Sequence, residues 1–117
     1  MKEMINDWRP EADSLIKRLE AAGVEIVSGD NGEDKFDYPN VSSNGPREKF
    51  LEDLIACDEA WLYVKVNGKD RSLYLVLGNS PGELVCDYVC DDVLDTVTTA
   101  HYQEWSEKQQ PKRVSPY

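Results

Sequence analysis

No lysine or arginine occurs between Arg71 and Lys108, although this stretch holds seven acidic residues. The stretch therefore accounts for most of the formal net charge of −10 at pH 7. A negative electrostatic potential of this kind repels nucleic acid and anionic membranes and attracts basic surfaces. We therefore expect a basic protein surface as the partner, and we expect neither nucleic acid nor a membrane to bind directly.

Long apolar runs are also missing. No segment approaches the roughly 18 apolar residues of a membrane span, and the N-terminal residues lack the apolar stretch of a signal peptide. We therefore expect a cytoplasmic protein. Its 117 residues fit a single domain, 1–117, and a hydrophobic share of 40% is enough for one core.

Residues that carry catalytic or metal chemistry are scarce. The three cysteines, Cys57, Cys86 and Cys90, match neither a zinc ribbon nor a Cys-x-x-Cys redox site. We expect them to be reduced and to lie buried as small hydrophobic residues. A single histidine, His101, cannot anchor a typical zinc site. We therefore assign no metal, no other cofactor and no catalytic residue from the sequence.

The first half of the chain predicts two helices, with a strand and a long loop between them. Apolar residues recur at helical spacing over 10–22, and a short apolar segment over 24–27 is typical of a strand. The segment 28–45 is rich in Gly, Asp, Asn, Ser and Pro and predicts a long loop. Within it, only 35–38 alternates as a short edge strand does. A second helix is expected to begin near Pro46.

The second half predicts three strands and a helix. Strand-like runs at 61–66 and 73–77 flank a turn that contains Asn-Gly, the strongest short hairpin signal. Alternation over 83–89 adds a third strand. A final helix, about 91–108, begins with acids and ends with lysine, as the helix dipole favours. The remaining residues, 109–117, are expected to be a flexible tail.

Because successive side chains of a strand point to opposite faces of the sheet, the leucines of the predicted hairpin fall on one face. Helices would cover that face, because it is the more apolar one. The predicted fold class is therefore α+β: an antiparallel β-meander, extended by the strand at 24–27, with three helices packed mainly on the leucine face.

One arc of the final helix is mostly apolar, whereas the opposite side is rich in acids. Carboxylates spaced by one helical turn resemble phosphates electrostatically, and tyrosine is a common interface anchor. This pattern indicates either a solvated helix face or a docking surface for a basic protein. The candidate binding residues are Asp91, Asp92, Asp95, Tyr102 and Glu107.

A second candidate surface is aromatic. Trp61, Tyr63 and Tyr74 fall on the sheet face opposite the leucines. If helices cover only the leucine face, these three side chains stay partly exposed and form a binding patch or a homodimer contact. A structural homo-oligomer is therefore one alternative function.

A third reading is a small enzyme or ligand-binding domain. His101 is followed three residues later by Glu104, as a general base is by its orienting partner, and Asp87 precedes the helix. This reading requires the three side chains to converge in a pocket. The binding hypothesis instead requires the acids to be spread over a convex face.

The segment from Leu75 to Tyr88, LVLGNSPGELVCDY, is followed by an acidic helix that ends HYQEW at 101–105. This third of the chain resembles small uncharacterised proteins of bacterial phages and plasmids. The resemblance implies a bacterial or mobile-element accessory protein, and some of these inhibit host defence enzymes by presenting acidic surfaces. It carries over no active-site residue.

Overall fold

The computed structural model describes residues 8–39, 44–77 and 82–108. The side chains of 44, 45, 107 and 108 are outside this description. The predicted tail, 109–117, also lies outside the described residues.

Five antiparallel strands form one sheet in the order β2-β1-β3-β4-β5. Strands β3, β4 and β5 form the predicted meander, and β1 joins it along β3, as expected for the segment at 24–27. The strand bounds are β1 (Glu25–Asp30), β2 (Lys35–Asp37), β3 (Glu59–Val66), β4 (Lys69–Val76) and β5 (Val85–Tyr88).

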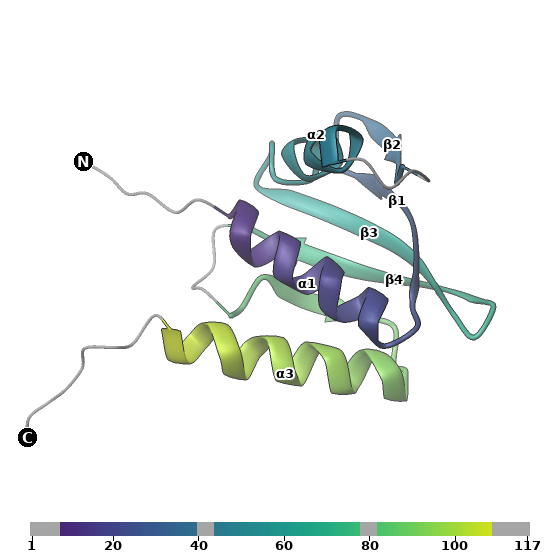
Figure 1. Cartoon of the computed structure of the whole chain (residues 1–117), viewed down its shortest axis with the longest axis vertical. Coiled ribbons are helices and arrows are strands. Elements are labelled where there is room, and N and C mark those ends of the chain that lie inside the picture. Colours follow the sequence, from purple (N-terminus) through teal and green to yellow (C-terminus); the bar gives the residue numbers. More distant parts are fainter. Residues whose placement is uncertain (1–7, 40–43, 78–81, 109–117) are drawn as a thin grey trace, which may run out of the picture.

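Three helices, α1 (Arg9–Ala21), α2 (Asn44–Leu54) and α3 (Asp92–Lys108), pack on the sheet. Helix α1 lies between the other two, beside α3 along most of its length and with α2 near β1 and β2 (Figure 1). All three bury apolar residues on the leucine face, which confirms the predicted α+β class.

The hairpin between β3 and β4 turns at Asn67 and Gly68. Both residues have positive φ, 54° and 79°, and the first pair beyond them is Val66 with Lys69. Two left-handed residues in a two-residue loop match the right-handed twist of the flanking strands. The turn therefore sets the register that places Leu62 opposite Leu73.

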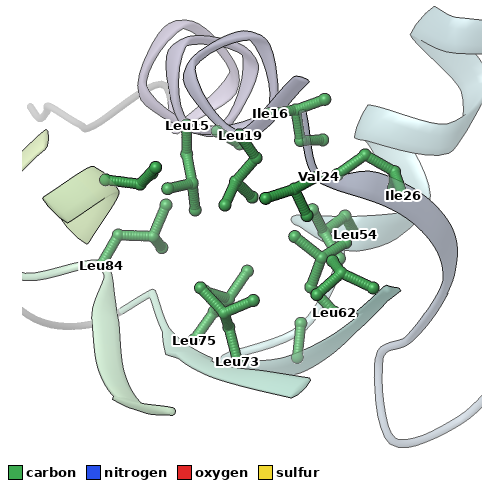
Figure 2. Packing of buried hydrophobic residues seen from close by; sticks show 14 of the residues in the cluster. Leu15, Ile16, Leu19, Val24, Ile26, Leu54, Leu62, Leu73, Leu75 and Leu84 are labelled. Atoms are coloured by element: carbon green, nitrogen blue, oxygen red, sulfur yellow. The ribbon is translucent and has the colours of Figure 1, made fainter. Parts of the chain in front are cut away.

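The core lies between α1 and the sheet. Leu15 and Leu19 of α1 point toward Leu73 and Leu75 of β4, with Leu84 closing one side (Figure 2). These five leucines are at most 1% exposed. Burial of apolar side chains on this scale drives folding and orients every surface described below.

The prediction of a loop over 28–45 is wrong for most of the described part. Strand β1 continues to Asp30, β2 forms at the predicted edge position, and α2 already begins at Asn44. Gly29 explains the difference, because a Cβ there would lie 2.6 Å from Cε2 of Phe36. The glycine that indicated a loop instead lets Phe36 pack across β1 toward Phe50.

The prediction of buried cysteines is wrong for two of the three. Cys57 is partly buried, whereas Cys86 and Cys90 are exposed. Tyr74 pairs with Asp87 and Leu75 with Val85, so Cys86 is the extra residue of a β-bulge in β5. The bulge interrupts the alternation that placed Cys86 on the core side.

Candidate binding surfaces

Asp91 caps the N-terminus of α3. Its Oδ1 accepts hydrogen bonds from the backbone N–H of Val93 (2.9 Å) and Leu94 (3.3 Å). Its Oδ2 accepts one from Nε of Arg71, at 3.4 Å. Partial burial acts to raise the pKa of this carboxyl, but the hydrogen bonds from Leu94, Val93 and Arg71 outweigh it, so the pKa is lowered. Asp91 therefore has a structural role as an N-cap.

The other candidate acids of α3 are more accessible. Asp92 and Asp95 are exposed, and Tyr102 is 48% exposed, the most exposed of the large hydrophobic side chains in the described segments. The hydroxyl of Tyr88 donates a hydrogen bond to Asp95, and this bond is the main cause of a raised Tyr88 pKa. Glu107 belongs to α3, but its side chain lies outside the described residues.

A groove of about 430 Å³ separates β5 from α3. Glu83, Val85 and Tyr88 line it from the sheet side, and Thr98, Thr99 and Tyr102 line it from the helix. A Cβ on Gly82 would lie 2.8 Å from the backbone N of Ser106, so one end of the groove is next to the C-terminal part of α3. At the other end Tyr88 contacts Asp95.

Ion pairs distribute the charge unevenly over the molecule. Around α1 and α2, acids and bases pair: Arg9 with Glu48 and Glu52, Lys17 and Arg47 with Asp13, and Lys49 with Asp53. On α3, Arg71 pairs with Asp91 and Arg18 with Glu104. By contrast, Asp87, Asp92 and Asp95 form no ion pair with any described residue. Exposed acids without such a pair also occur elsewhere, as at Glu33 and Asp34, but β5 and the first half of α3 hold no lysine or arginine at all. We call this region the β5–α3 surface: Glu83, Asp87, Tyr88, Asp92, Asp95 and Tyr102.

The aromatic candidates lie together on the other face of the sheet. The rings of Trp61 and Tyr74 stack with centroids 5.3 Å apart and planes inclined by 30°. Tyr63, two residues along β3, is 36% exposed. Within the described segments no helix covers this face, because all three pack on the leucine side.

His101 is fully buried and bonds to a residue of α1. Its Nε2 lies 2.8 Å from Oε2 of Glu11, which is 2% exposed. The same oxygen accepts a hydrogen bond from the backbone N–H of Gly82, so Nε2 is assigned as the donor. The partner predicted for His101, Glu104, instead pairs with Arg18.

The structure does not bring the proposed catalytic trio together. Asp87 pairs across the sheet with Tyr74, on the face opposite the one that α3 covers, and its Oδ1 accepts the N–H of Tyr88. His101 lies in the interior and Glu104 on the α1–α3 surface. Among the described residues, no group of three His, Cys, Asp or Glu side chains is arranged to hold a metal ion.

Sequence reasoning missed the groove itself. Glu83 and Tyr88 belong to one predicted strand and Thr98 to the predicted final helix, and only the packing of α3 beside β5 joins them. The one available signal was the absence of bases from 72 to 107, which covers both walls.

Comparison with protein-family models, with curated proteins and with solved structures gave no match. Within the described segments, none of the helices combines the length and apolar character needed to cross a membrane.

Proposed function

We propose that this protein is a non-catalytic acidic binding protein that engages a basic protein surface through α3 and the adjoining strand. The observation that carries the proposal is the position of the unpaired acids. Asp92 and Asp95 are exposed at the start of α3 and form no ion pair with a described residue, and Asp87, which also forms none, lies on the adjoining strand β5. Tyr102, exposed beside them, supplies an aromatic anchor of the kind enriched in interfaces.

Two of the five binding residues predicted from the sequence, Asp91 and Glu107, are not among the recognition residues that we propose. Asp91 supports the surface indirectly, because it caps the helix and is bonded to Arg71. Glu107 remains a candidate from the sequence alone. The recognition residues proposed are therefore Asp92, Asp95 and Tyr102, with Asp87 and Glu83 on the strand side.

The resemblance to phage and plasmid accessory proteins narrows the kind of partner. An accessory protein of that type would inhibit a host enzyme by covering a surface made for nucleic acid. Such a surface is basic, so a cluster of carboxylates would compete with phosphates for the same arginine and lysine side chains.

Affinity capture with a matched pair of variants tests the proposal. Asp92→Asn/Asp95→Asn removes two charges from α3 and leaves the Asp91 cap in place. Glu33→Gln/Asp34→Asn removes two charges from the exposed turn between β1 and β2, so the net charge is the same. We expect a partner that is captured from a lysate of the expressing cells by the native chain and the turn variant, but lost from the α3 variant. Equal recovery with all three chains would contradict the proposal.

The stacked Trp61–Tyr74 pair supports a second candidate, a homodimer through the open face of the sheet. Apolar contact of this kind is insensitive to salt, whereas repulsion between two chains of charge −10 weakens as salt is added. The molar mass from light scattering at low and at high ionic strength therefore tests for a homodimer as an alternative to the acidic binding protein. A dimer present at both, and lost in Trp61→Ser, would favour the homodimer.

A further inference from the structure

Strand β5 is an edge of the sheet. It pairs with β4 on one side, and no strand among the described residues pairs with its other side. Exposed edges are usually protected by lysine, by proline or by a covering element, because their free N–H and C=O groups pair with other chains. β5 reads Val-Cys-Asp-Tyr and has neither residue, but the N–H of Tyr88 is already bonded to Oδ1 of Asp87, so an added chain would pair with the remaining groups of this edge. The bulge at Cys86 limits any added pairing to a short segment.

The β5–α3 groove lies along this edge. It runs from Gly82, beside Ser106, to Tyr88, beside Asp95, so strand and helix line it over the whole length of β5. An extended chain rises about 3.3 Å per residue, and its alternate side chains would point into the groove. The added strand would thus pair with β5 while every second side chain contacts α3.

The chemistry of the walls selects a basic segment. Among the described residues that line the groove, Glu83 is the only charged one, and Asp95, which accepts a hydrogen bond from the hydroxyl of Tyr88, adds a second carboxylate at the far end. Tyr88 and Tyr102 offer ring surfaces on which guanidinium planes or lysine methylenes stack. Arg71, on the neighbouring strand β4, is bonded to Asp91.

We propose that an extended, arginine- or lysine-rich segment of a partner protein lies in the β5–α3 groove as an added strand beside β5. This inference rests on the proposed function and adds the form of the partner. The partner segment would bind as an extended strand in the groove, and not as a folded basic surface that contacts only the outer face of α3. Main-chain pairing supplies affinity, and the carboxylates with the two tyrosines supply the preference for basic side chains.

The test uses a defined probe, an acetylated and amidated heptapeptide of alternating arginine and threonine. Two further versions carry N-methyl groups on backbone nitrogens, one version on those of the arginines and the other on those of the threonines. All three peptides have the same charge. In an extended chain the N–H groups of alternate residues point to the same edge, so only the arginine set or only the threonine set can pair with β5. We therefore expect at least one methylated version to bind tenfold or more weakly. Amide shifts in NMR spectra should map to 82–89 and 95–102.

Two variants of α3 with equal charge provide the control. Thr99→Lys places a base in the groove, whereas Gln103→Lys places one on an exposed helix position that does not line it. We expect Thr99→Lys to weaken the peptide at least fivefold more than Gln103→Lys. Both positions are exposed, so circular dichroism should show the same folded state for both.

Several outcomes overturn the inference and leave the proposed function standing. Equal binding of all three peptides, or equal weakening by the two variants, would mean that charge alone attracts the probe. No binding of the unmethylated peptide would also reject the groove as the site. A peptide-independent dimer that Val85→Lys abolishes would assign the edge to a second copy of this chain. The proposed function itself fails only if partner capture ignores Asp92 and Asp95.

Discussion

Nε2 of His101 lies 2.8 Å from Oε2 of Glu11, a residue ninety positions earlier, and both side chains are buried. The carboxylate also accepts the N–H of Gly82 at 3.1 Å. One buried oxygen therefore joins α1, α3 and the segment that leads into β5. Because the groove lies between β5 and α3, this contact positions both of its walls.

Breaking the Glu11–His101 pair should destabilise the protein strongly. Removing one partner leaves the other buried without compensation, which typically costs roughly 3–5 kcal/mol. We expect Glu11→Leu and His101→Leu each to lower the free energy of unfolding by about this amount. The double variant should lose much less than the sum, because no unpaired group remains except the N–H of Gly82. Urea denaturation of the four chains measures the coupling, and additive losses would show that the pair does not act as a unit.

Gly82→Ala should be far more damaging than the same change at Gly23. Both glycines have nearly the same positive φ, 89° and 88°, so both substitutions strain the backbone. At Gly23 an added Cβ meets nothing within 4 Å, whereas at Gly82 it lies 2.8 Å from the backbone N of Ser106. We expect the free energy of unfolding of Gly82→Ala to be lower than that of Gly23→Ala by about 1–3 kcal/mol, the usual cost of overpacking. Equal thermal and urea stability would show that α3 moves aside.

Replacing Asp91 should weaken the start of α3 in a pH-dependent way. Its pKa is lowered in the folded protein, so its stabilising contribution is present above the unfolded pKa of about 3.9 and is lost as the pH falls through the folded value. Asp91→Asn keeps a cap acceptor but loses the charge that faces Arg71. We expect this variant to be less stable than the native chain at pH 7 and to approach it below about pH 4. Asp91→Ala should also lose the cap, which raises the unfolding equilibrium constant roughly fivefold.

Asp95→Asn should lower the pKa of the Tyr88 phenol toward its ordinary value. The hydrogen bond to the Asp95 carboxylate is the main cause of the raised pKa, because it favours the neutral phenol. The corresponding stability is present below the unfolded pKa of about 10 and is lost as the pH rises through the folded value. Titration of the Tyr88 ring carbon by NMR measures the shift. Asp92→Asn is the control, since Asp92 does not bond to Tyr88, and an equal shift there would point to general charge effects.

Much of the fold could be predicted because its signals are local. Helical spacing in 10–22 predicts α1, and the Asn67-Gly68 turn predicts the β3–β4 hairpin and its register. The leucine face follows from alternation along the two strands. These features depend on neighbours a few residues away, where side-chain period and turn chemistry dominate.

Predictions failed where distant residues decide the outcome. Gly29 belongs to a strand because Phe36 packs against its bare Cα, and Cys86 is exposed because β5 contains a bulge. Both depend on strand pairing, which a reading of one segment at a time does not contain. The same is true of the groove, whose walls come from two elements.

The sequence by itself determined that the protein is acidic and that seven of its acids lie in a stretch, 72–107, that holds no base. Only the tertiary structure decided which of these acids pair with a base and which do not. Asp91 meets Arg71 across 20 positions and Glu104 meets Arg18 across 86, whereas Asp92 and Asp95 meet no base among the described residues. The physical reason is that a charge is neutralised by what lies within a few ångströms of it, and the packing of α1, β4 and α3 sets those distances.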